Sequence, residues 1–324
     1  MVAERIGFEL RPMAIGAEIT GIDYSADLPE PTRRALYDAW LEYGVLLFRG
    51  VDSIARHLNV SRWFGEPELH PVEKLRFPEE PLLMPLGYGE NGPIYVFEDG
   101  PRLSRLPWHR DTAFTPDICR GAALRIVETP PVGGETMFCD SSLAYDALSP
   151  ELKARIENLE VRCKYRFDLA KAAQPGRGGH WASARPATAA DGVEVPTKPI
   201  TAEIEARFPA VVHPLVITHP ESGRKCLFIS PTYVECVLGM AQEKSDALMT
   251  ELVTHLLSAQ FVYIHRWKNN DVVLWDNFRC LHAARGYRPS DTRKGLRTTL
   301  KGALTTGRYF DPGVSAPLPL DFAD

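Results

Sequence analysis

Residues 261–276 read FVYIHRWKNNDVVLWD, two runs rich in apolar, β-branched and aromatic residues separated by a short polar stretch. Each run predicts a β-strand, and the turn-forming residues Lys268-Asn-Asn-Asp271 predict that a hairpin joins them. A second hairpin is predicted around His219-Pro-Glu-Ser-Gly-Arg224. Other strand-like runs begin at Val45, Ala122, Thr136, Val161, Val211, Lys225 and Leu296. Many short strands with few helices between them predict an antiparallel barrel or jelly roll, not a sheet of alternating strands and helices.

Two amphipathic stretches predict helices that flank this β-structure. Residues 31–44, PTRRALYDAWLEYG, place Leu36 and Trp40 on one stripe, with a proline at the start and Gly44 just past the end. Residues 245–257 carry a leucine at every fourth position. Both patterns have the helical period and one apolar face, so we expect both helices to pack against the sheets.

Composition bounds the class of protein. The chain has 324 residues, 44% of them hydrophobic, and a net charge of −5 without long blocks of one sign, which predicts one folded domain over 1–324 and no nucleic-acid partner. It lacks both an apolar run of membrane-spanning length and an N-terminal signal core, and its six cysteines are scattered. We therefore expect a cytoplasmic protein without membrane contact. Residues 172–198, rich in Ala, Gly and Pro, are expected to form a lid or insertion.

Histidines and arginines at two places in the sequence indicate a metal site and an anion site. His109 and Asp111 are two residues apart, so in a strand both side chains would face one point and could supply two ligands of a 2-His-1-carboxylate site. His282 is followed at offsets of 11 and 15 by Arg293 and Arg297, which share a face in an extended strand. Arginines that face a barrel interior require anions, although a solvated strand face would also accommodate them.

The ordered set of these motifs is more specific than any one of them, and it resembles the Fe(II)/2-oxoglutarate-dependent dioxygenases of the taurine dioxygenase (TauD/TfdA-like) family. The resemblance runs through most of the chain and is carried by Phe64-Gly65-Glu66, His70-Pro71-Val72, Trp108-His109-Arg110-Asp111, Gly133-Gly134-Glu135-Thr136, residues 218–228, Trp275-Asp276-Asn277, His282, Arg293 and Arg297. It implies a mainly β fold with flanking helices and a double-stranded β-helix (jelly-roll) core.

The resemblance also implies roles for single residues. His109, Asp111 and His282 match the iron ligands of the family. Thr136 matches the residue whose hydroxyl contacts the distal carboxylate of 2-oxoglutarate, and Arg293 matches the arginine that forms a salt bridge with it. In some relatives the cosubstrate arginine lies nearer the position of Arg297, so the roles of the two arginines could merge or exchange.

Three positions match the substrate pocket of the taurine enzyme. Arg297 and His70 match the residues that hold the substrate sulfonate there. Glu73 replaces a tyrosine of that pocket, and an acid at this position would either attract an amine or point to solvent. The resemblance thus implies a small anionic or zwitterionic substrate that carries a carboxylate or sulfonate-like group.

The activity implied is the oxidation of an unactivated C–H bond by hydroxylation, desaturation or oxidative cleavage, with Fe(II) as cofactor and 2-oxoglutarate and O2 as cosubstrates. Succinate and CO2 would be formed from 2-oxoglutarate, and relatives of this kind form dimers or tetramers. Two alternatives remain open at this point. One is a zinc-dependent hydrolase with the same three ligands, although the sequence has no HExxH motif. The other is a non-catalytic jelly-roll protein that binds a metal or ligand.

Overall fold

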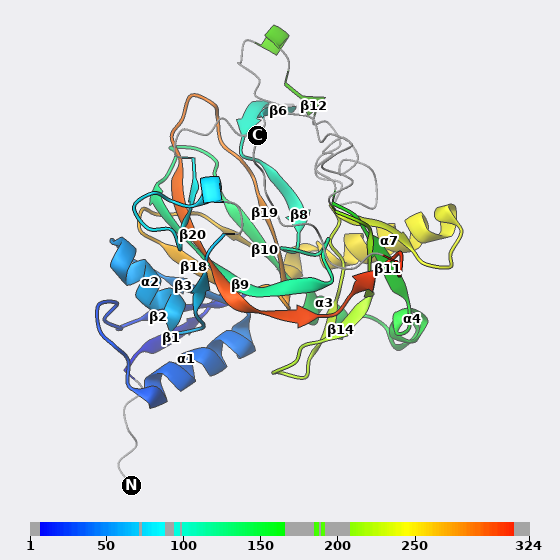
Figure 1. Cartoon of the computed structure of the whole chain (residues 1–324), viewed down its shortest axis with the longest axis horizontal. Helices are drawn as coiled ribbons and strands as arrows, with labels where there is room; N and C mark the ends of the chain where they lie inside the picture. The colour runs from blue at the N-terminus through cyan, green and yellow to red at the C-terminus, as the bar shows by residue number, and fades with distance from the viewer. Residues whose placement is uncertain are drawn as a thin grey trace.

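The computed structural model describes residues 7–70, 73–87, 94–97, 99–165, 185–187, 189–191 and 208–313. Within these residues the protein is mainly β, with helices on the outside of the sheets (Figure 1). The expected lid at 172–198 lies outside the described residues, apart from 185–187 and 189–191. In the part of the chain that is described, each helix is too short or too polar to cross a membrane.

Two sheets form the centre of the molecule. The larger has eight strands, in the order β1 (Glu9–Pro12), β2 (Ala17–Thr20), β3 (Val45–Phe48), β18 (Val272–Asp276), β9 (Asp117–Glu128), β20 (Lys294–Thr305) and β4 (Pro67–Glu68), with β5 (Met84–Leu86) also paired to β20. The smaller has four strands, in the order β17 (Val262–His265), β10 (Thr136–Asp140), β19 (Cys280–Ala284) and β8 (Leu106–His109). Described strand pairs are antiparallel except β2 with β3.

Smaller elements surround these sheets. Further strands are β6 (Ile94–Phe97), β7 (Gly100–Leu103), β11 (Glu160–Cys163), β12 (Arg185–Pro186), β13 (Val211–Pro214), β14 (Val216–Thr218), β15 (Lys225–Leu227), β16 (Val234–Val237) and β21 (Arg308–Tyr309). The α-helices are α1 (Glu30–Tyr43), α2 (Ile54–Arg62), α3 (Ser141–Asp146), α4 (Pro150–Ile156) and α7 (Gln242–Leu256). Short 3-10 helices are η1 (Glu73–Leu75), η2 (Ala189–Asp191) and η3 (Ala259–Phe261).

The predicted hairpin over 261–276 is wrong. A turn is present, in which the amide of Asp271 donates to the carbonyl of Lys268, but β17 pairs with β10 whereas β18 pairs with β3 and β9. The chain therefore crosses from the smaller sheet to the larger one at this turn. All five residues of β18 are buried, and a strand covered on both faces and paired on both edges belongs in the middle of a sheet. The other predicted hairpin is confirmed, because β14 pairs with β15 around 219–224.

Successive side chains along the strands of the larger sheet point to its two faces, so a separate hydrophobic cluster packs on each face. In β3, Leu46 and Phe48 pack in the cluster that includes Leu36 and Trp40 of α1, whereas Val45 and Leu47 pack toward the smaller sheet. The predicted helix over 31–44 is confirmed as α1, and it ends at Gly44 in the left-handed region with φ of 71°. The interface between the sheets includes Phe138 of β10 and Trp275 of β18, whose ring centres are 5.6 Å apart.

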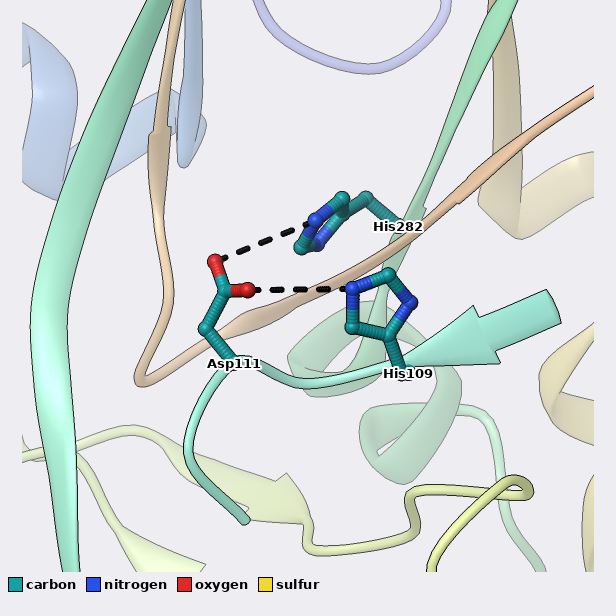
Figure 2. A group of neighbouring side chains, drawn as sticks. All are labelled: His109, Asp111 and His282. Atoms are coloured by element: carbon teal, nitrogen blue, oxygen red, sulfur yellow. Dashed lines mark ion pairs between the residues drawn. The ribbon is translucent and has the colours of Figure 1, made fainter. Parts of the chain in front are cut away.

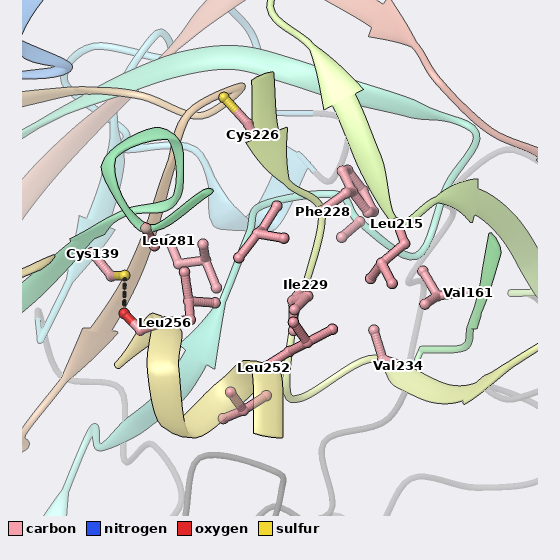
Figure 3. Packing of buried hydrophobic residues seen from close by; sticks show 14 of the residues in the cluster. Cys139, Val161, Leu215, Cys226, Phe228, Ile229, Val234, Leu252, Leu256 and Leu281 are labelled. Carbon is pink, nitrogen blue, oxygen red and sulfur yellow. Dashed lines mark hydrogen bonds between the residues drawn. The ribbon is translucent and has the colours of Figure 1, made fainter. Parts of the chain in front are cut away.

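A third cluster covers the outer face of the smaller sheet. Figure 3 shows Cys139 and Leu281 of this sheet near Leu252 and Leu256 of α7, and the Cys139 thiol donates to the Leu256 carbonyl at 3.0 Å. Helix α7 is the predicted helix over 245–257 and begins three residues earlier. The layers are therefore α1 and α2, the larger sheet, the smaller sheet, then α3 and α7, with the interior between the sheets left for the site.

Candidate active site

The structure brings His109, Asp111 and His282 together at one end of this interior. His109 ends β8 and lies directly opposite His282 of β19 in the antiparallel pairing. The Nε2 atom of His109 is 3.7 Å from Oδ1 of Asp111, and Nε2 of His282 is 3.8 Å from Oδ2, as Figure 2 shows. One ligand atom from each residue lies within 4.8 Å of the others. Two imidazole nitrogens and one carboxylate thus surround a single point.

Asp111 reaches this point from a turn, which corrects the expectation that it shares a strand face with His109. Strand β8 ends at His109, and Thr112 adopts a positive φ of 58°, a conformation that side chains other than glycine rarely take. Asn277 holds the turn, because its Oδ1 accepts from the Asp111 amide at 3.0 Å and its Nδ2 donates to the Asp111 carbonyl at 3.1 Å. The carboxylate is thereby aimed at the histidines by backbone contacts.

Arg110, between His109 and Asp111 in the chain, makes its described contacts away from the point that these two side chains and His282 surround. Its side chain is fully buried and donates to the carbonyls of Asn277 at 2.6 Å and Leu227 at 3.2 Å. Sequence patterns assign no positioning role to Arg110 or Asn277. Both carbonyls that accept from Arg110 belong to residues more than 100 positions away along the chain, so local sequence pattern carries no signal for these contacts.

The two histidines are prepared to bind a cation. The Nδ1–H of His109 donates to the Pro107 carbonyl at 2.7 Å, an arrangement that assigns the proton to Nδ1 and leaves the Nε2 lone pair toward Asp111. Burial, together with the neighbouring His109, holds the pKa of His282 well below its ordinary value. A neutral imidazole is the form that binds a metal ion.

The Asp111 carboxylate has a strong partner in Arg297, whose Nη2 lies 2.6 Å from Oδ2. Burial raises the pKa of Asp111, but Arg297 and His282 outweigh it and hold the pKa well below the usual range. The carboxylate is therefore ionised at neutral pH. The sequence predicts that an inward-facing Arg297 requires an anion. Asp111 already supplies that negative charge, so Arg297 needs no bound anion to be paired.

Arg293 lacks such a partner. Its side chain is buried, its Nε donates to the Gly134 carbonyl at 3.2 Å, and it forms no ion pair with a carboxylate among the described residues. Burial lowers its pKa to about 10, which leaves it charged at neutral pH. Gly134 has a φ of 76°, and a Cβ there would lie 3.2 Å from the Arg293 side chain. Pro130 Cγ would lie closer still, at 2.8 Å, so glycine at this turn makes room for Pro130 and for the aliphatic part of the Arg293 side chain.

Thr136 follows the same turn and is buried at the start of β10, where its Oγ1 accepts from Trp267 Nε1 at 3.0 Å. His70 is partly buried, and its carbonyl accepts from Arg76 Nε at 2.8 Å. Glu73 is exposed in η1. Thr136 is paired with Ala284, two residues beyond His282 on β19, and Arg293 contacts Gly134, two residues before Thr136. The described contacts do not place Glu73 beside His109, Asp111 or His282.

The donor set fits a particular kind of metal. Two imidazoles and one carboxylate on one side of a cation form the 2-His-1-carboxylate arrangement, which leaves positions open for other ligands and is typical of non-haem Fe(II) oxygenases. The buried Arg293, without a carboxylate partner in the described structure, is the group that a dicarboxylate cosubstrate would require beside such a metal.

Comparison with known proteins agrees with this chemistry. The profile of the family described as "Taurine catabolism dioxygenase TauD, TfdA family" matches residues 8–299. The (S)-phenoxypropionate/alpha-ketoglutarate-dioxygenase of Sphingobium herbicidovorans is 30% identical over 288 residues, covering 86% of this chain and 89% of the relative. An alkylsulfatase of Acinetobacter baylyi is 30% identical over 314 residues, covering 95% and 89% of the two chains.

A solved structure, that of AAD-2 in complex with Mn(II) and N-oxalylglycine, superposes with a TM-score of 0.67 at 27% identity and covers 92% of this chain and 99% of its own. The family match covers nearly the whole chain, and it favours a dioxygenase over a zinc-dependent hydrolase. The chain therefore belongs to the TauD/TfdA family and is an Fe(II)- and 2-oxoglutarate-dependent dioxygenase.

Proposed function

We propose that His109, Asp111 and His282 bind the Fe(II) of this dioxygenase, and that the enzyme oxidises an unactivated C–H bond of a small anionic metabolite. The observation that carries the proposal is the convergence of two histidine Nε2 atoms and one ionised carboxylate within 4.8 Å. When bound, the iron supplies the oxidative chemistry, coupled to conversion of 2-oxoglutarate and O2 to succinate and CO2. The residues of the chain hold and orient the reactants.

Arg293 is the anchor for the distal carboxylate of 2-oxoglutarate, with the Thr136 hydroxyl as a second donor. Support for this choice over Arg297 comes from the partners of the two arginines. Arg297 already forms an ion pair with Asp111, whereas Arg293 has only the Gly134 carbonyl among its described partners. A buried guanidinium with free Nη donors matches a carboxylate in geometry and in charge.

Arg297 and His70 bind the anionic group of the primary substrate. Arg297 is partly exposed and holds Asp111 through one Nη atom, and a guanidinium offers five N–H donors, so it can meet a second anion without releasing the carboxylate. The names of two relatives, a phenoxypropionate dioxygenase and an alkylsulfatase, indicate anionic substrates for those proteins. Because Glu73 is exposed, the proposal gives it no catalytic part.

The two facing sheets are interpreted as the jelly-roll core of a single domain. Support comes from the crossing of the chain between the sheets at 266–271 and from the near-complete span of the family match. All six cysteines are free thiols, which supports a reducing compartment such as the cytoplasm.

Anaerobic addition of 2-oxoglutarate to the Fe(II)-loaded protein tests the metal assignment. The proposal predicts a weak charge-transfer band in the visible range for the native protein and none for His282→Ala. His255→Ala, which changes a histidine of α7 far from the three ligands in sequence, serves as the matched control and should keep the band. Thermal unfolding of all three proteins tests whether each variant keeps its fold. A band of unchanged intensity in His282→Ala refutes the assignment.

Succinate release in air then tests the reaction and its substrate class. A panel of aryloxy acids, alkyl sulfates, sulfonates and amino acids is screened, and the carboxylic and sulfonic acids that lack an amine are compared with their uncharged amides or sulfonamides. We expect succinate formation to be stimulated by one of the anions and not by its amide. Stimulation by the neutral compounds alone would contradict an anionic substrate while leaving the metal site intact.

A further inference from the structure

In the described part of the chain, helix covers only part of the outer face of the smaller sheet. Helix α7 packs over Cys139 and ends at Leu256, but the face continues as Met137 and Ile264, which are paired across β10 and β17. Ile264 is 39% exposed, a large fraction for an isoleucine in the middle of a strand. A groove of about 740 Å³ lies at this place. Its volume is within the range of small-molecule sites.

This groove is separate from the metal site. Trp108 and Met137 line it, and each is the chain neighbour of a residue of the site, His109 and Thr136 respectively. Because successive side chains of a strand point to opposite faces, the sheet itself stands between the groove and the metal point. The groove also includes Gly133, at the turn whose next residue contacts Arg293.

Three arginines line the groove above this apolar floor: Arg102, Arg105 and Arg285. Arg105 is held with its guanidinium carbon 4.1 Å from the centre of the Phe97 ring. Burial, and then the positive charges of Arg285 and Arg102, lower the pKa of Arg105 to about 10, so the three cations lie within electrostatic range of one another.

Among the described residues that line the groove, basic side chains outnumber acidic ones. Its three arginines compare with two acids, Asp99 and Glu135. Asp99 is already engaged by Arg102, with Nη2 to Oδ2 at 2.5 Å. Like charges gathered beside an apolar surface attract an anion, and they attract it more strongly where the surface excludes water.

We propose that this groove is a second ligand site, which binds an organic carboxylate or sulfonate with a flat apolar body. The body lies on Met137, Val262 and Ile264, and the anionic head faces Arg105 and Arg285. The site is distinct from the iron centre and does not depend on the role proposed for that centre.

4-Bromobenzoate is a suitable probe, because it combines a carboxylate with a flat apolar ring and its bromine can be located by anomalous diffraction. Crystals soaked in the probe should show bromine over the apolar floor of the groove, with the carboxylate within hydrogen-bonding reach of Arg105 or Arg285. In titration calorimetry, Arg285→Gln and Arg105→Gln should each weaken binding by about tenfold or more, the loss expected for a charged hydrogen bond.

Three controls test whether the probe binds at this groove and through its charge. Arg266→Gln removes an exposed arginine just beyond β17 that does not line the groove, and should leave affinity unchanged. His282→Ala should also bind the probe normally, because the metal site is not involved. 4-Bromobenzamide, which lacks the charge, should bind at least about tenfold more weakly than the acid.

The proposal is overturned if bromine is found only at the metal site, if the amide binds as well as the acid, or if no binding is detected at millimolar probe. Self-association abolished by Arg285→Gln, without binding of the probe, would show that the groove is a protein contact and would equally overturn it.

Discussion

Replacement of Arg293 by methionine is the sharpest test of how the enzyme holds 2-oxoglutarate. Arg293 is 8% exposed and its guanidinium donates to the Gly134 carbonyl, without an ion pair to a carboxylate in the described residues. Methionine has a similar length and fills the same buried space, but it offers no donor and no charge. The distal carboxylate of the cosubstrate would then be buried without its cation.

The expected loss follows from this burial. Removing one partner of a buried, hydrogen-bonded charge pair costs about 2–5 kcal/mol. That corresponds to an affinity for 2-oxoglutarate weaker by roughly 30-fold to several thousand-fold. The Gly134 carbonyl also loses a donor, which is expected to cost about 1 kcal/mol of folding stability and to leave the protein folded.

Anaerobic titration of the Fe(II) protein with 2-oxoglutarate, followed by its visible absorption band, measures this affinity directly. Lys294→Met is the matched control, since Lys294 is the next residue and forms its ion pair with Glu128 at the surface. Native affinity in Arg293→Met refutes the assignment. Native affinity there combined with a large loss in an Arg297 variant would show that the two arginines have exchanged roles.

Substitutions at three other buried or partly buried positions give further tests. Thr136→Val should weaken 2-oxoglutarate binding by about 1 kcal/mol in the same titration, because only a neutral hydroxyl is lost. Arg297→Lys keeps the charge but loses the planar fork, so the KM for the primary substrate should rise about tenfold while 2-oxoglutarate affinity stays near native; the reverse pattern would contradict it. Burial lowers the pKa of His57 to about 3 from an ordinary 6.5, so the unfolded chain binds a proton first and stability is lost as pH falls below about 6.5. By pH 5 the free energy of unfolding should have fallen by about 2 kcal/mol. Urea unfolding measures this free energy at pH 7 and at pH 5. The difference between the two pH values should be smaller in His57→Gln than in the native protein or in His255→Gln.

Elements defined by local chemistry can be predicted from the sequence. The helix over 31–44 is predictable because its apolar stripe, its early proline and Gly44 are all local signals, and α1 ends where Gly44 places it. The turn at 219–224 is predictable for the same reason. The predicted hairpin over 261–276 is wrong because apolar runs report burial and do not report which edge of which sheet a strand joins.

The candidate site also combines features that the sequence predicts with contacts that only the tertiary structure reveals. The spacing of His109 and Asp111 identifies both residues, but a shared strand face is not what brings them together, because Asp111 reaches the site from a turn clamped by Asn277. The partner of Arg297 is also invisible in the sequence. Asp111 and Arg297 are 186 residues apart, and no periodicity connects positions that meet only when the two sheets face each other. The identities of the groups can be predicted, but their pairings depend on tertiary structure.

Those pairings bear on which substrates the site favours. Iron(II) brings two positive charges, and Arg293 and Arg297 each bring one, whereas Asp111 brings one negative charge. The dianion of 2-oxoglutarate leaves one positive charge uncompensated in a buried site, and the nearby buried Arg110 adds to the positive field. A substrate with a single anionic group and no ammonium group supplies the missing charge, whereas a zwitterion supplies none in net terms. Glu73 is exposed, and its described contacts do not bring it to the three residues of the site, so electrostatics favours a simple monoanion over an amino acid.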